Sequence, residues 1–126
     1  MPHFQIDYSP NLAERLDIAG LLVVLRDAAV ETGVFPLAGI RVRATAVDHV
    51  VMADGNPEHA FLDLSVRLRA GRTLEARKAA TAHIFAAAER YCADVMENSS
   101  FMLSMEMRDI DPELSPKASS IRHYLE

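Results

Sequence analysis

Pro2 is the residue in this sequence best suited to chemistry, because removal of Met1 would leave it as a free amine. The small second residue favours that removal. The product is a secondary amine on a rigid ring, which can act as a base or nucleophile with little conformational freedom. An α-amino group titrates near ~7.7–8.0, and apolar surroundings or nearby cations lower that pKa. We therefore expect Pro2 to transfer protons near neutral pH.

The residues after Pro2 alternate in the manner of a β-strand. Apolar Phe4, Ile6 and Tyr8 alternate with polar side chains over roughly 2–8. A strand at this point would fix the amine at the end of a sheet, whereas a flexible tail would not. Proline is also tolerated at the first position of a strand. The alternative, that Pro2 follows the start codon by accident and has no role, remains open.

Two arginines, Arg41 and Arg72, are the second candidate group. The planar guanidinium pairs with a carboxylate through two parallel hydrogen bonds, and it can stabilise negative charge that develops during a reaction. Arg72 precedes Thr73, a candidate helix N-cap, and anions are favoured at helix N-termini. Arg43 shares a strand face with Arg41 and could reach the same anion. The alternative is that these arginines are solvated surface charges.

The other polar residues suggest no further chemistry. We expect Arg67 and Arg69 to line a solvated face or to pair with acids such as Asp63. The five histidines show no short metal-ligand spacing, and Cys92 is the only cysteine. We therefore expect no metal site and no cofactor.

The chain repeats one strand–helix–strand pattern, over about 2–52 and about 60–109. The tail, 112–126, contains two prolines and room for one short helix. Strands are predicted over roughly 2–8, 38–52, 62–69 and 101–108, and helices from Asp17 to Gly33 and from about Thr73 to Met96.

This order predicts a single α+β domain over residues 1–126, built as a tandem βαβ repeat. The crossover rule makes the strands of each unit parallel, so two units give a four-stranded sheet with two helices on one face. No sequence remains to cover the other face. We expect that face to be an apolar patch, buried in a symmetric homo-oligomer whose sheets face a common centre.

Composition excludes several classes of partner. The net charge of −5 argues against nucleic acid or an anionic membrane as the main partner. No apolar run approaches the ~20 residues of a membrane span, and no signal peptide is visible at the start. With a single cysteine, the chain suits a reducing cytoplasm.

Four segments of the sequence carry a family resemblance: 2–4 (Pro-His-Phe), 33–41 (Gly-Val-Phe-Pro-Leu-Ala-Gly-Ile-Arg), 52–55 (Met-Ala-Asp-Gly) and 70–77 (Ala-Gly-Arg-Thr-Leu-Glu-Ala-Arg). The sequence resembles the tautomerase superfamily and, within it, the 5-carboxymethyl-2-hydroxymuconate isomerases. The resemblance implies a tautomerase-like βαβ repeat, a homotrimer and isomerisation of a small polycarboxylate. The implied substrate is a dienol with three carboxylates, formed by ring cleavage in the homoprotocatechuate branch of aromatic catabolism.

The resemblance also implies roles for the candidate residues. Pro2 would shuttle the proton, and Arg41 and Arg72 would hold carboxylates, in one site per chain that lies between subunits. Two alternatives remain open. Relatives with an amino-terminal proline also hydrate, dehalogenate or decarboxylate unsaturated acids, which would call for an acid placed to activate water. A chain that keeps Met1 would instead be a non-catalytic trimeric binding protein.

Overall fold

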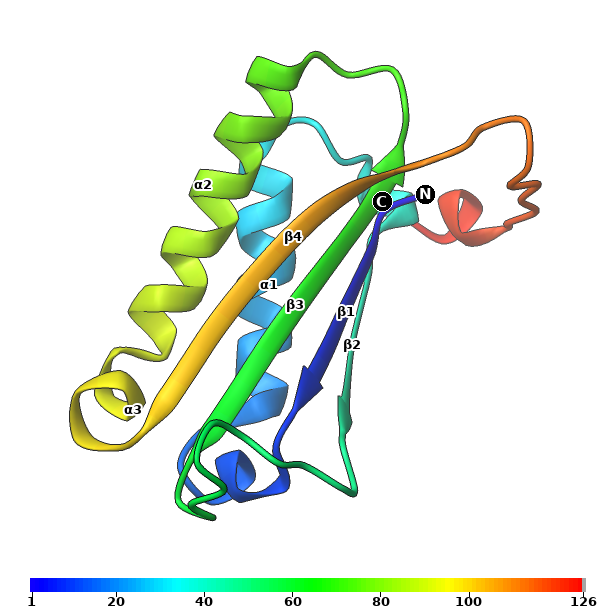
Figure 1. Cartoon of the computed structure of the whole chain (residues 1–126). Coiled ribbons are helices and arrows are strands. Elements are labelled where there is room, and N and C mark those ends of the chain that lie inside the picture. The colour runs from blue at the N-terminus through cyan, green and yellow to red at the C-terminus, as the bar shows by residue number, and fades with distance from the viewer. Residues whose placement is uncertain (126) are drawn as a thin grey trace.

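The protein is a four-stranded sheet with two long helices packed on one face (Figure 1). The structure, a computed structural model, describes residues 1–125. The main elements, in chain order, are β1 (His3–Tyr8), α1 (Ile18–Thr32), β2 (Arg41–Ala46), β3 (Ala60–Arg69), α2 (Leu74–Tyr91) and β4 (Phe101–Ile110).

The strand order is β2-β1-β3-β4. The pairs β1–β2 and β3–β4 are parallel, and β1 and β3 meet antiparallel in the centre. Each parallel pair is joined through a helix, α1 in the first unit and α2 in the second. The predicted pair of βαβ units in a single sheet is therefore confirmed.

The predicted helix caps are also confirmed. The Asp17 side chain accepts a hydrogen bond from the Gly20 amide at 3.2 Å, and the Thr73 side chain accepts one from the Ala76 amide at 3.1 Å. Both bonds satisfy amides that the first turn leaves without a partner. Gly33 ends α1 with a φ of 75°, a left-handed conformation that glycine adopts without steric cost.

Three predicted boundaries were wrong. The second strand begins at Arg41 and not at Ala38, because residues 37–39 form a 3₁₀ turn. The second strand ends at Ala46, because β1 ends at Tyr8 and the Val47 amide makes the last bond to it, 2.9 Å from the Tyr8 carbonyl oxygen. The second long helix ends at Tyr91, because Cys92 leaves helical geometry with φ −93° and ψ 7°. A short helix, α3 (Ala93–Asn98), follows it.

Short 3₁₀ turns complete the elements: η1 (Pro10–Glu14), η2 (Leu37–Gly39) and η3 (Ile121–Tyr124). The last of these is the short helix expected in the tail. No helix among residues 1–125 is long and apolar enough to cross a membrane.

The core lies between the sheet and the two helices. Phe4 and Ile6 of β1 are fully buried, and apolar side chains from β3, α1 and α2 surround them. The ring of Phe4 meets that of Phe35 edge-on, with 5.4 Å between centroids. This contact packs the segment after α1 beneath the start of β1.

The face of the sheet away from the helices is polar, so the expected apolar patch was wrong. The Arg43 side chain donates to Gln5 at 3.2 Å, and the Ser104 hydroxyl donates to Asp63 at 2.7 Å. Successive strand residues point to opposite faces, and each strand uses its apolar positions on the helix side. The remaining positions are mostly charged or hydrogen-bonding, and the apolar face from which a homo-oligomer was predicted is therefore not present.

Candidate active site

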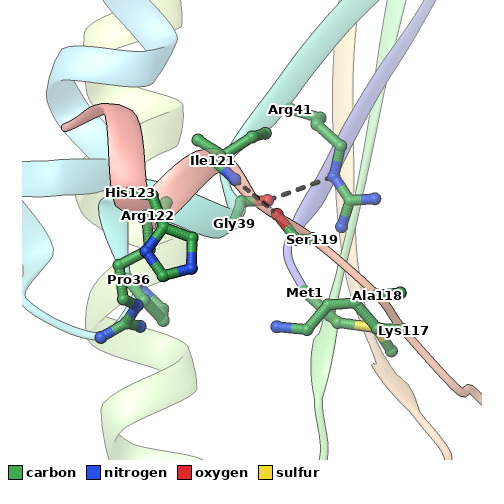
Figure 2. A pocket seen from close by; sticks show the side chains of 11 residues that line it. Met1, Pro36, Gly39, Arg41, Lys117, Ala118, Ser119, Ile121, Arg122 and His123 are labelled. Atoms are coloured by element: carbon green, nitrogen blue, oxygen red, sulfur yellow. Dashed lines mark hydrogen bonds between the residues drawn. The ribbon is translucent and has the colours of Figure 1, made fainter.

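A cavity of about 460 Å³ lies at the end of the sheet where β1 begins (Figure 2). One wall comes from the N-terminus and the segment around η2, and the other comes from the C-terminal segment. The lining residues are Met1, Pro36, Ala38, Gly39, Arg41, Lys117, Ala118, Ser119, Ile121, Arg122 and His123.

Pro2 is buried immediately beside this cavity, directly before β1. Its carbonyl oxygen accepts a hydrogen bond from the Arg41 amide at 3.3 Å, which extends the parallel β1–β2 pairing to the first residues of the chain. Gly39 lies against the ring. A Cβ at that position would lie 3.1 Å from Pro2 Cδ and 3.0 Å from the Met1 nitrogen. The missing side chain at Gly39 therefore lets the proline approach closely.

The amine at the N-terminus lies in an environment that favours its neutral form. In the structure this amine belongs to Met1, and burial lowers its pKa below the usual value. The positive charges of Lys117, Arg41, Arg72 and Arg69 lower it further. An amine on Pro2, one residue along, would face the same group of cations.

Arg41 projects into the cavity from the start of β2. Its Nε donates to the Gly39 carbonyl oxygen at 3.2 Å, and the side chain is otherwise exposed (Figure 2). This single bond orients the guanidinium, and the Arg41 side chain lines the cavity. Arg41 can therefore bind a carboxylate there in the way the sequence predicts.

Arg72 lies close enough to the amine for its charge to lower the amine's pKa, but it does not line the cavity. Its Nε donates to the Val34 carbonyl oxygen at 2.9 Å, and its Nη1 donates to the Arg69 carbonyl oxygen at 3.0 Å. The half-buried guanidinium thus joins the segment after α1 to the end of β3. Arg72 is a structural link as well as a candidate ligand for carboxylate.

Arg43 lies two residues further along β2, outside the set that lines the cavity. Its guanidinium contacts His3 Nδ1 at 3.2 Å and donates to Gln5 at 3.2 Å, on the polar face of the sheet. Substrate binding by Arg43 stays a prediction, and it would require the guanidinium to leave these two partners.

Sequence reasoning missed the contribution of the tail. Lys117, Arg122 and His123 all line the cavity, although they are more than a hundred residues from Pro2. The sequence feature that could have indicated this is the presence of three basic side chains within seven residues, 117–123, in a chain that is acidic as a whole. Arg69, expected on a solvated face, also acts on the amine through its charge. Among residues 1–125, no three or more His, Cys, Asp or Glu side chains are grouped as metal ligands.

His3 should make stability depend on pH. Burial and the charges of Arg41, Arg67 and Arg43 lower its pKa from 6.5 to about 4. As the pH falls, His3 therefore gains its proton in the unfolded chain before it does so in the folded chain. The contribution of His3 to the free energy of unfolding is highest above pH 6.5 and decreases as the pH falls towards 4. Urea unfolding between pH 7 and pH 4.5 should show a smaller acid-induced loss of unfolding free energy in His3→Gln than in the original chain. Equal losses of unfolding free energy in the two proteins would show that His3 is not the source of the pH dependence.

Solved structures with this architecture place the fold among the tautomerases. A crystal structure of a 5-carboxymethyl-2-hydroxymuconate delta-isomerase superposes with a TM-score of 0.92 and 26% sequence identity, covering 98% of this chain and 92% of that one. A 5-carboxymethyl-2-hydroxymuconate isomerase from Deinococcus radiodurans R1 superposes with a TM-score of 0.90 and 30% identity, covering 99% and 95%. The protein thus has the fold of isomerases in the tautomerase superfamily.

Sequence comparison narrows this class to one family. The family model described as 5-carboxymethyl-2-hydroxymuconate isomerase matches residues 2–125. The 5-carboxymethyl-2-hydroxymuconate Delta-isomerase of Escherichia coli is 36% identical over 121 residues, which are 96% of each chain. The chain belongs to the 5-carboxymethyl-2-hydroxymuconate isomerase family.

Proposed function

We propose that this protein isomerises 5-carboxymethyl-2-hydroxymuconate or a closely related tricarboxylate dienol, with the amine of Pro2 as the base. The observation that carries the proposal is the cationic cavity at the N-terminus, where burial and four positive side chains lower the pKa of the terminal amine, which in the structure is that of Met1. The identity to the Escherichia coli isomerase supports the same substrate. The reaction would belong to the homoprotocatechuate branch of aromatic catabolism.

The proposed reaction moves one proton and leaves the oxidation state of the substrate unchanged overall. Once Met1 is removed, the Pro2 nitrogen accepts the proton of the enol hydroxyl, and the electron pair left on oxygen spreads along the diene. The protonated amine then returns the proton to a carbon of the conjugated chain, which gives the keto isomer. Arg41 and Arg72 would bind carboxylates and stabilise the intermediate dienolate.

The lining of the cavity favours isomerisation over the hydratase, dehalogenase and decarboxylase alternatives, because those reactions would need an acid there. Activation of water calls for a carboxylate beside the reacting carbon. The described residues that line the cavity include neither Asp nor Glu. A simple proton shuttle by one amine, in contrast, requires no such group.

We also propose a homotrimer acting in the cytoplasm. Trimeric assembly is what the family resemblance implies. The outer edge of β2 supports an interface, because its backbone groups are unpaired within the described chain and exposed Val50 and Val51 follow it. Sedimentation equilibrium at micromolar concentration tests the trimer, and a stable monomer would contradict it.

The cytoplasmic location is supported by Cys92. This cysteine is free and buried, burial raises its pKa to about 11, and a free thiol suits a reducing compartment.

The pH dependence of the isomerisation tests the proposed base. We expect kcat/KM to fall at low pH as the Pro2 amine gains a proton, with an inflection below the ordinary α-amino range of ~7.7–8.0. The sign follows from burial and from the nearby cations, which lower the pKa of the Met1 amine, one residue before the proposed base. Spectrophotometric assay of dienol loss in the original chain and in Pro2→Ala should show that this acid limb shifts or disappears in the variant. An identical limb in both would assign the titration to another group.

A further inference from the structure

We propose that the C-terminal segment 117–123 forms the specificity wall of the site, with Lys117 binding the carboxylate of the substrate's carboxymethyl arm. This inference rests on the proposed function and goes beyond it, because that function assigns partners to only two of three carboxylates. Arg41 and Arg72 would hold the other two. The third needs a cation of its own, and among the described residues that line the cavity Arg41 is the only cation that the sheet supplies.

The geometry of the cavity supports this assignment. Segment 117–123 supplies six of the eleven lining residues. In Figure 2, Met1 and Lys117 lie on one side of the cavity, whereas Arg122 and His123 lie beside Pro36 on the other. The volume of about 460 Å³ is within the range of ~300–1,000 Å³ of small-molecule sites. The tail therefore closes a space that the sheet alone would leave open.

The charges in the cavity fit a small polyanion. Arg41, Lys117 and Arg122 line it, and no acid does so among the described residues. The ion pairs found within residues 1–125 do not involve Lys117. Of the side-chain charges that lower the pKa of the N-terminal amine, that of Lys117 has the largest effect. Lys117 therefore lies near the Met1 amine, one residue before the proposed reacting nitrogen, and forms none of the ion pairs found in the described chain.

Local hydrogen bonds hold the segment on both sides of Lys117. Before it, the Ser115 hydroxyl donates to the Asp111 carbonyl oxygen at 2.6 Å. After it, the Ile121 amide donates to the Ser119 hydroxyl at 3.2 Å, and the His123 amide to the Ser120 carbonyl oxygen at 3.0 Å. Lys117 thus extends from a segment whose two ends are turns, which limits the freedom it loses on binding.

Substrate selectivity is the readout that distinguishes this role from general support of the fold. The test compares kcat/KM for 5-carboxymethyl-2-hydroxymuconate with that for 2-hydroxymuconate, in which hydrogen replaces the carboxymethyl arm. We expect Lys117→Met to lower the first value about 10- to 100-fold, the size expected for one lost charge-assisted contact. The second value should change less than about threefold, since that substrate lacks the group that Lys117 binds.

Two matched variants serve as controls. Lys78, on the exposed surface of α2, is the only other lysine, and Lys78→Met should leave both values unchanged. Lys117→Arg keeps the charge and should retain most of the selectivity for the tricarboxylate. Equal losses on both substrates in Lys117→Met, or no loss on either, would overturn the assignment.

A binding measurement separates this inference from the proposed function. Calorimetry with propane-1,2,3-tricarboxylate and with glutarate does not require catalysis. We expect the original chain to bind the tricarboxylate more tightly and Lys117→Met to lose that preference. If the original chain isomerises neither dienol, the proposed function fails, whereas a preference that depends on Lys117 would still support the tail as the anion-binding wall. A preference unchanged in Lys117→Met would overturn the inference even in an active enzyme.

Discussion

A chain that keeps one extra residue ahead of Pro2 should lose about 10²- to 10⁴-fold in kcat/KM, the range that a positioned general acid–base group contributes. The extra residue turns the proline nitrogen into an amide, which has no lone pair available for a proton. Met1 occupies this position in the structure, where it lines the cavity and carries the free amine of the chain. That amine is displaced from the buried, rigid proline ring, so it should replace the lost base poorly.

The control is a chain with a cleavable extension, assayed before and after a protease restores Pro2 as the first residue. Activity should return on cleavage, and sedimentation should be the same in both states. Pro2→Ala should lose less than the blocked chain, because a free primary amine remains, although it is held less rigidly. Full activity in a chain shown by intact mass to retain a residue before Pro2 would disprove the mechanism.

Arg41→Ala and Arg72→Ala should each lower kcat/KM by one to two orders of magnitude. Each would remove a charge-assisted contact to carboxylate, worth about 1.5–3 kcal/mol. A rise in KM alone would indicate ground-state binding, and a fall in kcat would indicate stabilisation of the dienolate. Arg26→Ala, on the exposed face of α1, is the control and should leave the rate unchanged. Normal activity in both variants would rule out the carboxylate-binding model.

The two variants should differ in stability. The Arg72 guanidinium bridges the carbonyl oxygens of Val34 and Arg69, so Arg72→Ala should also lower Tm. Arg41 donates to a single carbonyl oxygen from an exposed position, so Arg41→Ala should leave Tm almost unchanged. Thermal unfolding of both variants checks this difference.

Mixing inactive subunits tests whether the site draws on more than one chain. Because Arg72 lies close enough to the amine of its own chain to lower the pKa of that amine, Pro2-blocked subunits mixed with Arg72→Ala subunits should recover little activity. Substantial recovery, after exchange has been verified by mass, would indicate that the two residues of one site come from different chains.

Local rules were enough to predict most of the fold. The period-two pattern in the strands, the caps at Asp17 and Thr73 and the left-handed Gly33 depend on neighbouring residues, and the structure has all of them. The polar sheet face could also have been predicted, because His3, Gln5 and Asp7 already occupied the positions opposite the core. A sheet face that no helix covers can be polar, as it is here.

The cavity could be predicted only in part. Arg41 is brought to the N-terminus by a parallel pairing that the βαβ pattern implies, His3 opposite Arg41. Lys117 reaches the same place through a tail of irregular structure, and no periodicity links it to Met1. The close approach of Gly39 to Pro2 likewise depends on packing between segments that are distant in the sequence.

Segments from both extremes of the chain meet at one cavity, and this restricts how the protein can be handled. An affinity tag joined ahead of Pro2 blocks the proposed base, and a fusion partner placed just after segment 117–123 stands beside the opposite wall. Attachment to a surface or a reporter is therefore best made through the solvent-facing sides of α1 and α2, where exposed residues such as Arg26 and Lys78 offer positions remote from the cavity.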